Sequence, residues 1–152
     1  MGQFKCIEFR ASDNEYLHKD FHGVLCYAIK YLDDNFGHEA TTEYLKQVGL
    51  AIYKDLIQNI KIQGLAAIEK HIIDVFAIEG GEFETIHVPG KLTVIVKACP
   101  AIAHLKQRGL FYTERFCEAT KVVNHSICQT ADYKCSCSYE PGAGCCVQEF
   151  WK

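Results

Sequence analysis

The stretch CSCSYEPGAGCC, residues 135–146, decides how the C-terminal part of this chain folds. It holds four of the nine cysteines, and a Pro-Gly-Ala-Gly segment at 141–144 divides them. Proline and glycine are typical of tight turns, and the flanking residues alternate in polarity as they do in strands. We therefore predict a β-hairpin with strands at 133–140 and 145–151.

The register of this hairpin follows from the length of its loop. A loop of 141–144 places Glu140 opposite Cys145, so that Tyr139 lies opposite Cys146. Successive side chains of a strand point to opposite faces. One face is rich in thiols and aromatic rings, and we expect it to face the core: Cys135, Cys137, Tyr139, Cys146, Gln148 and Phe150. The other face is largely polar, and we expect it to face water: Ser136, Ser138, Glu140, Cys145, Val147 and Glu149.

The remainder of the chain shows two kinds of hydrophobic pattern. Apolar residues at three- and four-residue spacing predict five helices. They cover 15–36, after a capping box that starts at residue 12, then 39–62, 65–78, Pro100 to Gly109, and Thr113 to about Gln129. A β-branched pattern predicts a further hairpin, with strands at 83–88 and 92–97 around Pro89-Gly90. The order predicts one α+β domain over 1–152. It has N-terminal helices followed by a four-stranded antiparallel sheet (hairpin, helices, hairpin), with the helices on one face.

Composition narrows the classes of partner. The chain has 49% hydrophobic and 23% charged residues and a net charge of −3, as is ordinary for a globular domain. No run of Lys or Arg is longer than two residues, so we expect no nucleic-acid partner. No segment approaches the ~20 apolar residues of a membrane helix, and the first residues lack the apolar run of a secretory signal. We therefore expect a cytoplasmic protein without membrane contact. The first two helices carry more apolar surface than one small sheet can cover, which favours a homodimer.

Thiols stay reduced in the cytoplasm, so nine cysteines indicate metal binding, catalysis or inert burial. In the predicted register Cys137 and Cys146 are diagonal neighbours about 7 Å apart. Cys117, on the helix that precedes the hairpin, is placed to complete a metal site with them, and zinc is the expected metal. Cys99 stands at the first turn of a helix, where the helix dipole favours a thiolate. Burial of these thiols as small apolar groups is the open alternative.

Three motifs together resemble a known family: Cys99-Pro100 after a strand, Phe116-Cys117 within the next helix, and GCCVQEF at 144–150. Over about residues 20–151 the chain resembles the family named after L-2-amino-thiazoline-4-carboxylic acid hydrolase. The family name implies that water opens a cysteine-derived five-membered ring.

The order of elements also resembles the small-molecule-binding domains related to 4-vinyl reductase, some of which hold zinc with cysteines and a carboxylate. By position, Cys117 and Cys146 match the helix cysteine and the last-strand cysteine of those domains. Where that family has a glutamate and then a cysteine three residues later, this chain has Cys137 and then Glu140. The reversed order departs from the closed four-ligand zinc site of that family.

Three functions follow as hypotheses. The first is a hydrolase that opens a small cyclic C=N substrate, for which a base, a metal-bound hydroxide or a thiolate must activate the attack. The candidate catalytic residues are Cys99, Cys117, Cys146, His22 and His104. Tyr53 and Gln148 are the candidate substrate-binding residues. The alternative is a small-molecule-binding module in which cysteines hold a structural metal. The third is a thiol protein for metal handling or redox exchange, which the absence of a CxxC motif disfavours.

Overall fold

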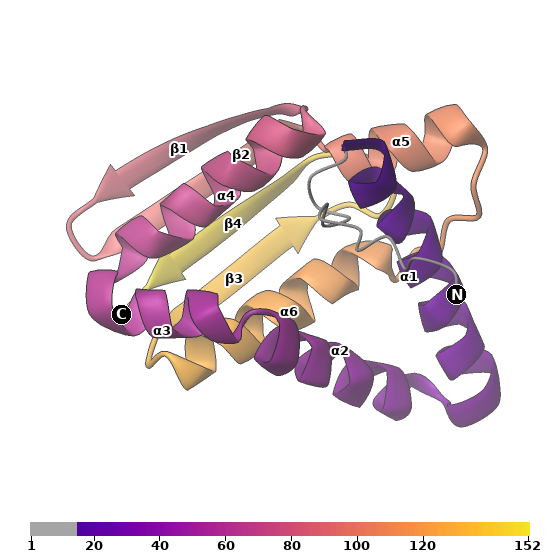
Figure 1. Cartoon of the computed structure of the whole chain (residues 1–152), viewed down its shortest axis with the longest axis horizontal. Coiled ribbons are helices and arrows are strands. Elements are labelled where there is room, and N and C mark those ends of the chain that lie inside the picture. Colours follow the sequence, from indigo (N-terminus) through magenta and orange to yellow (C-terminus); the bar gives the residue numbers. More distant parts are fainter. Residues whose placement is uncertain (1–14) are drawn as a thin grey trace, which may run out of the picture.

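The computed structural model describes residues 15–152, which form six helices and one four-stranded antiparallel sheet (Figure 1). The helices are α1 (Glu15–Phe36), α2 (His38–Ile52), α3 (Lys54–Gln63), α4 (Leu65–Glu79), α5 (Pro100–Arg108) and α6 (Phe116–Thr130). The strands are β1 (Glu82–Val88), β2 (Lys91–Ala98), β3 (Lys134–Tyr139) and β4 (Cys146–Trp151). The predicted α+β class is confirmed. The predicted capping box begins outside the described residues.

The sheet consists of two hairpins joined edge to edge, in the order β1-β2-β4-β3. The first hairpin turns at Pro89-Gly90, where Gly90 has the positive φ of 81° that this tight turn needs. The second hairpin has the predicted register, with Tyr139 opposite Cys146. Strands β2 and β4 pair antiparallel in the centre of the sheet. The thiol-bearing hairpin therefore contributes one central strand and one edge strand.

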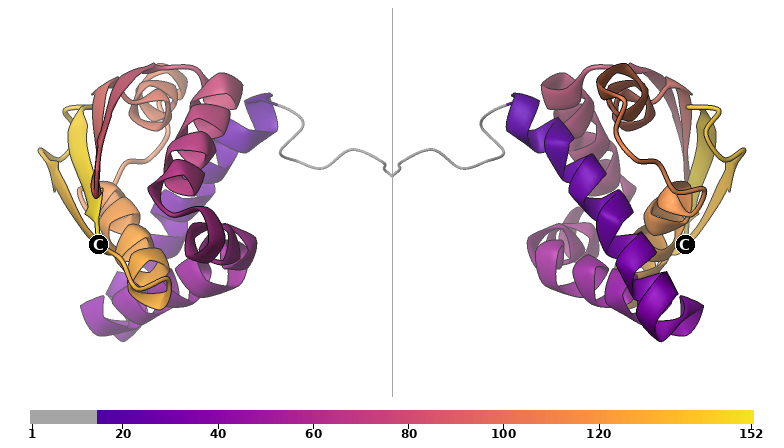
Figure 2. Two further views of the ribbon diagram at one scale, coloured as in Figure 1. Left: turned by 90° about the vertical axis from the view of Figure 1, so that its left-hand side faces the viewer. Right: turned by 90° about the vertical axis from the view of Figure 1, so that its right-hand side faces the viewer.

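All six helices lie on one face of the sheet, as predicted (Figure 2). The inner face is lined by alternate residues of β2, among which Leu92 and Val94 are fully buried. The outer face carries paired polar groups, such as the Lys91–Glu149 ion pair at 2.5 Å. This division matches the predicted inward and outward faces of the C-terminal hairpin.

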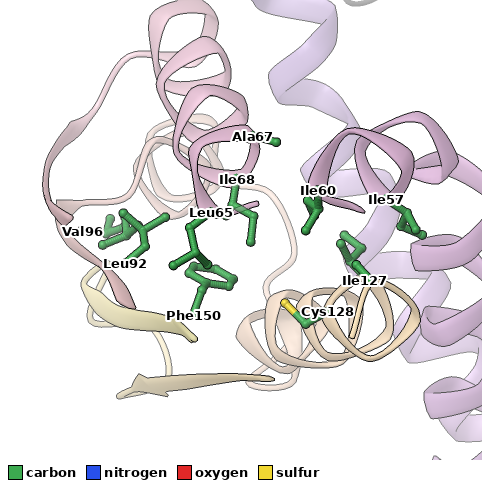
Figure 3. Close-up of a cluster of buried hydrophobic side chains, with 12 residues drawn as sticks. Ile57, Ile60, Leu65, Ala67, Ile68, Leu92, Val96, Ile127, Cys128 and Phe150 are labelled. Carbon is green, nitrogen blue, oxygen red and sulfur yellow. The ribbon is translucent and has the colours of Figure 1, made fainter. Parts of the chain in front are cut away.

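The main core lies between the sheet and helices α3, α4 and α6 (Figure 3). Leu92 and Phe150, paired across β2 and β4, form its floor. Ile60, Ile68 and further apolar residues of α3 and α4 pack against it. Full burial of each such side chain contributes roughly 1.5–3 kcal/mol before the entropy of ordering it is counted. This core fixes the position of β4, and with it the thiol-bearing end of that strand.

The single helix predicted over 39–62 is wrong in one respect, because the chain leaves helical geometry at Tyr53 (φ −101°, ψ 20°). Helix α2 packs chiefly on α6, whereas α3 packs chiefly on α4. The bend turns Ile57 and Ile60 into the core and leaves Ile52 70% exposed. Packing against two different partners thus overrides a continuous apolar seam.

Helices α5 and α6 begin next to the C-terminal hairpin. Pro100 occupies the first position of α5, as predicted, and Cys99 is the N-terminal cap residue just before the predicted first turn. Helix α6 begins at Phe116 rather than at Thr113, because Thr113 forms a preceding turn. The backbone N–H of Phe116 donates to the Thr113 carbonyl at 2.9 Å. The backbone N–H of Cys99 donates to the carbonyl of Gly144 at 2.7 Å, which ties the hairpin loop to the start of α5.

Candidate thiol site

Two cysteines of the C-terminal hairpin form the centre of the candidate site. Cys137 on β3 and Cys146 on β4 are diagonal neighbours on the inner face, close enough for the Cys137 thiol to act as a donor that lowers the pKa of Cys146. Gln148 adds a second donor, since its Nε2 lies 3.5 Å from the Sγ of Cys146. The Oε1 of Gln148 accepts from the Nδ2 of Asn124, on α6, at 2.8 Å. A chain of donors therefore runs from α6 through β4 to one sulfur.

The orientation of the Gln148 amide follows from these contacts. Gln148 lies opposite the fully buried Val94 on one side and opposite Cys137 on the other. A polar side chain at such a position needs partners for its amide atoms. Asn124 donates to the amide oxygen of Gln148, so the amide NH2 group of Gln148 points toward Cys146. Packing alone would favour an apolar residue here, which marks Gln148 as a positioning residue for the thiol.

The two donors make Cys146 the thiol that ionises most readily. The hydrogen bond from Cys137, and to a smaller extent that from Gln148, lowers the pKa of Cys146 from 9.0 to about 7, against the opposing effect of burial. The same contact raises the pKa of Cys137, which keeps its proton. Gln148 also donates to Cys146, which favours the charge on that sulfur. A thiolate near neutral pH is a nucleophile.

Cys99 and Cys117 lie close to this pair. The charge of Cys146 acts on both, and both adjoin the hairpin loop through Gly144 or Gly142. Burial raises the pKa of Cys99 even though the backbone N–H groups of α5 oppose it. The predicted lowering effect of the helix N-terminus is present at Cys99, but desolvation outweighs it, so the thiol does not ionise readily. Burial also raises the pKa of Cys117.

Tyr112 and Cys26 close the site beside Cys117. The Tyr112 hydroxyl lies near the Cys117 sulfur, but within residues 15–152 no atom stands in hydrogen-bonding geometry to this buried oxygen. Burial, and then the nearby Cys117, raises the pKa of Tyr112 to about 12. Cys26, on α1, is fully buried in the apolar cluster behind Cys117. Burial raises its pKa as well, so Cys26 packs as a small apolar side chain.

The two candidate histidines each contact a carboxylate. The Nε2 of His22 lies 2.9 Å from the Oε2 of Glu79, which is 4% exposed. The His22 ring also packs edge-on against the Phe116 ring, with centroids 5.8 Å apart. Phe116 directly precedes Cys117 in the chain. His104 is 6% exposed and lies 2.8 Å from the Oδ1 of Asp20. Both pairs join α1 to a neighbouring helix, and a carboxylate partner fixes the orientation of an imidazole ring.

Tyr53 occupies a separate position at the bend between α2 and α3. Its ring meets His71 edge-on with centroids 5.6 Å apart, and it packs against the main core. Burial raises the pKa of Tyr53, and the charge of Glu79 raises it further. Burial also lowers the pKa of His71. Tyr53 therefore stays a predicted substrate contact, while Gln148 contacts the thiol itself.

A second thiol pair joins the same hairpin to α6, which carries Cys128. Cys135 accepts a hydrogen bond from Cys128, which lowers the pKa of Cys135 and raises that of the buried Cys128. Cys135 and Cys137 open into a groove of about 550 Å³ between α2, α6 and the edge strand β3. Lys121 lies exposed along this groove. Solvent therefore reaches the hairpin thiols from the side of β3.

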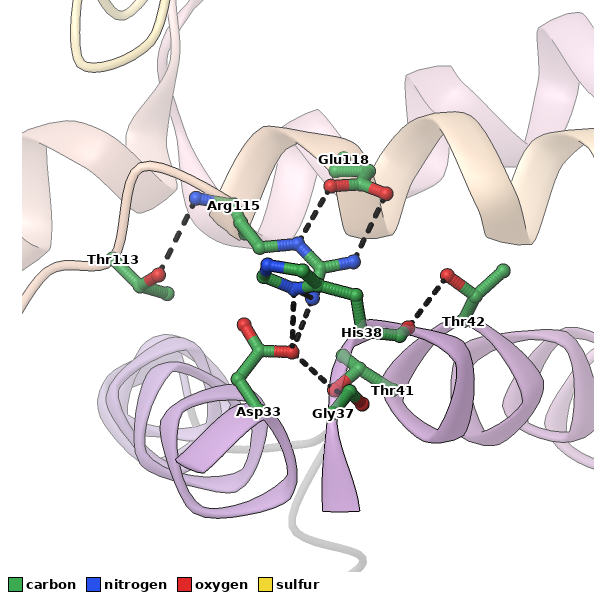
Figure 4. Close-up of polar contacts among 8 residues, drawn as sticks. All are labelled: Asp33, Gly37, His38, Thr41, Thr42, Thr113, Arg115 and Glu118. Atoms are coloured by element: carbon green, nitrogen blue, oxygen red, sulfur yellow. Dashed lines mark hydrogen bonds and ion pairs between the residues drawn. The ribbon is translucent and has the colours of Figure 1, made fainter. Parts of the chain in front are cut away.

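A charged cluster lies beside this groove and shares Glu118 with it (Figure 4). The guanidinium of Arg115 donates to both carboxylate oxygens of Glu118, at 2.8 and 3.0 Å, and also to Asp33 on α1. The hydroxyl of Thr41 donates to the same Asp33 at 2.5 Å. Arg115 thus joins α1, α2 and the start of α6, and it positions the helix that bears Cys117 and Asn124.

The predicted zinc set was Cys117, Cys137 and Cys146. Within residues 15–152 no group of three or more His, Cys, Asp or Glu side chains is placed to hold a metal ion. Zinc binding therefore stays a prediction from the sequence. All eight cysteines of the described part of the chain are free thiols. In the same residues no helix combines the length and the hydropathy that crossing a bilayer requires.

Sequence reasoning missed Asn124, Glu79 and Tyr112. Asn124 could have been found from its spacing. Cys117, Asn124 and Cys128 are seven and four residues apart, so they share one side of a helix. Glu79 and Tyr112 carried no such signal, since their contacts come from distant elements. Comparison with known proteins found no family model and no curated sequence that matches this chain.

Proposed function

We propose that the protein is a thiol-dependent hydrolase of a small cyclic C=N substrate, such as a cysteine-derived thiazoline, with Cys146 as its nucleophile. The observation that carries the proposal is the pair of donors, Cys137 and Gln148, on the Cys146 sulfur. Thiolates attack electrophilic carbon well, and the carbon between nitrogen and sulfur of such a ring is electrophilic. The motif resemblance to the thiazoline-carboxylate hydrolase family supports the same chemistry.

The reaction divides into two steps. In the first, the Cys146 sulfur bonds to the ring carbon and the ring C–S bond breaks, which leaves the substrate sulfur as a thiolate that takes the Cys137 proton. In the second, water adds to the same carbon and the bond to Cys146 breaks. One water proton goes to the substrate nitrogen and the other returns to Cys137, so the product holds a C=O group and the thiolate is restored.

Other described residues have supporting roles in this scheme. Gln148 orients and stabilises the thiolate, and Asn124 fixes Gln148. His22, paired with Glu79 and adjacent to Phe116, is the candidate that moves protons near Cys117. Cys99 and Cys117 line the apolar side of the site, where their raised pKa keeps them neutral.

The test uses purified reduced protein and a 2-aminothiazoline-4-carboxylate, with product formation followed by mass spectrometry. Wild type is expected to open the ring, Cys146→Ser to lose at least a hundredfold in rate, and Cys145→Ser to keep the wild-type rate. Cys145 is the matched control because it precedes Cys146 but is exposed. No turnover by wild type, with or without zinc, would rule the proposal out.

The second candidate is a small-molecule-binding module. The groove of about 550 Å³ beside Cys135 and Cys137 favours it, since its size suits a metabolite. A ligand-induced rise in melting temperature without any turnover, unchanged in Cys146→Ser, would select this candidate instead.

We also propose that the protein forms a homodimer through α1. Phe21, Val24, Tyr27 and Tyr31 are 57–61% exposed and recur at three- and four-residue spacing on this helix. Such a stripe is typical of a helix that packs against another helix. Light scattering should give twice the mass of one chain for wild type and for the control Ile62→Asp on α3, and the mass of one chain for Val24→Asp. A monomeric wild type would contradict the proposal.

A further inference from the structure

We propose that Cys137 and Cys146 are also a redox-active dithiol, in which a hydroperoxide oxidises Cys146 and Cys137 then closes a disulfide across the hairpin. Disulfide formation itself does not depend on the hydrolase activity. Its consequence, reversible loss of that activity on oxidation, rests on the proposed function, because the same sulfur would serve as nucleophile.

Geometry carries the first step of this inference. Cys137 and Cys146 lie on the same face of two directly paired strands, so no segment has to move far to bring their sulfurs together. The cysteines are diagonal neighbours on paired strands, a relationship with a Cα spacing of about 7–8 Å. Disulfides span Cα spacings of about 4.4–6.8 Å, so the strands must draw slightly closer. A bond formed in this way is strained and therefore readily reduced, as a regulatory disulfide must be.

The surroundings of the pair supply the other requirements. Cys137 lines the open groove beside β3, so a small oxidant reaches the pair from solvent. Gln148 donates to Cys146, which favours the thiolate form that reacts with peroxides. Cys137 stands diagonally across the hairpin from the sulfur that is oxidised, which is the arrangement of a resolving thiol.

The chemistry balances with hydrogen peroxide as the oxidant. The Cys146 thiolate attacks one peroxide oxygen, the O–O bond breaks, and Cys146 sulfenic acid and hydroxide form. The Cys137 sulfur then attacks the sulfenic sulfur, the S–O bond breaks, and the disulfide and one water form. The pair loses two electrons in total, and a dithiol reductant such as dithiothreitol returns them.

Two neighbouring thiols make the proposal specific. Cys145 adjoins Cys146 but lies exposed in the hairpin loop, outside β4. Cys128 and Cys135 also act on each other's pKa, but Cys128 is only 1% exposed and no side-chain amide donates to Cys135 within the described residues. We therefore expect oxidation at Cys137 and Cys146 before the other pair.

The test treats reduced wild type with one equivalent of hydrogen peroxide, alkylates the remaining thiols, and maps peptides by mass spectrometry. Trypsin leaves residues 135–152 in one piece, so chymotrypsin is added to cut after Tyr139 and separate the two cysteines. The expected result is a linked pair of peptides, 135–139 and 140–150, assigned by fragmentation to Cys137 and Cys146. Dithiothreitol should restore the two thiols.

Variants decide the roles of the two sulfurs. In Cys137→Ser the disulfide should be absent and dimedone should label Cys146 sulfenic acid, whereas Cys145→Ser should behave as wild type. Cys137→Ala repeats the test if the serine variant unfolds. A first disulfide at Cys128–Cys135, a disulfide between chains, or an unchanged linkage in Cys137→Ser would overturn the proposal. Mapping is independent of turnover, so failure here leaves the hydrolase proposal standing, and the reverse also holds.

Discussion

The Nε2 of Gln148 lies 3.5 Å from the Sγ of Cys146, two residues earlier on the same face of β4. A strand places residues i and i+2 on one face, so this contact needs no long-range element of its own. What it needs is a fixed amide, and Asn124 on α6 provides that by donating to the Gln148 oxygen at 2.8 Å. Helix α6 thus influences a thiol that it does not carry.

Replacing Gln148 by leucine should make Cys146 less reactive near neutral pH. The substitution removes one of the two donors to the thiolate and keeps the side chain similar in size. Since Cys137 still donates, we expect the pKa of Cys146 to rise from about 7 by roughly one unit, which lowers iodoacetamide labelling at pH 7 about fivefold. The pH profile is measured in a Cys145→Ser background, so that only the inner thiol contributes. An unshifted profile would show that Gln148 does not act on this sulfur.

Removing the Tyr112 hydroxyl should leave the protein as stable or make it more stable. Within residues 15–152 no atom stands in hydrogen-bonding geometry to this buried oxygen, and the nearby Cys117 sulfur is a weak acceptor, so Tyr112→Phe removes a desolvated polar atom without losing a strong bond. We expect the free energy of unfolding, from urea titration, to rise by about 0–1 kcal/mol. A fall of more than about 1 kcal/mol would reveal a partner. A fall in turnover with unchanged stability would instead assign the hydroxyl to the substrate.

The C-terminal hairpin was predictable from the sequence because its fold is local. Loop length determines the register, and alternation determines the faces, so these two patterns are enough to place Cys137 next to Cys146. The contact between Asn124 and Gln148 could not be predicted, because it depends on how α6 is rotated above the sheet. The bend at Tyr53 carried no proline or glycine signal, and only packing against two helices explains it.

The charge on each thiol was predictable only in part. The sequence identifies helix termini, which favour a thiolate, but it does not give the degree of burial, which opposes one. For Cys99 burial wins, and its pKa is raised. For Cys146 the hydrogen-bond donors outweigh burial and lower the pKa, and this depends on the diagonal position of Cys137. The balance between these two opposing effects depends on tertiary packing, which no local pattern encodes.

Arg115 should contribute to stability at neutral pH but much less in acid. Burial alone would raise the pKa of Asp33, but hydrogen bonds from Thr41, Arg115 and His38 together hold it below 3.8. Arg115 likewise lowers the pKa of Glu118 below 4.5. Carboxylates with a depressed pKa stabilise the fold above their unfolded pKa, and this contribution is lost as the pH falls through the folded value.

Arg115→Met is therefore expected to lower the free energy of unfolding by about 1–3 kcal/mol at pH 7, as for hydrogen bonds to charged groups. The difference from wild type should shrink as the pH falls from about 5 to 3, because protonated carboxyls no longer need the guanidinium. Arg115→Lys keeps the charge but loses the bidentate contact with Glu118. Its free energy of unfolding should therefore lie between those of wild type and Arg115→Met. Urea titrations across this pH range give the comparison, and a difference independent of pH would contradict it.

Gly81 should tolerate a side chain far less than its neighbour Gly80. Both glycines have positive φ, 80° at Gly80 and 96° at Gly81, so alanine strains the backbone at either position. A Cβ on Gly81 would also lie 2.6 Å from the Ala98 carbonyl oxygen and 2.7 Å from the Pro100 ring, whereas a Cβ on Gly80 meets nothing within 4 Å. Strain alone costs about 1–3 kcal/mol, and overpacking adds a similar amount at Gly81.

Because Ala98 and Pro100 flank Cys99, Gly81→Ala should shift the start of α5 and so lower both the melting temperature and the labelling of Cys146 at pH 7. Gly80→Ala should lower only the melting temperature, and by less. Equal effects of the two variants on both measurements would show that the close approach to Ala98 and Pro100 does not position the thiol site.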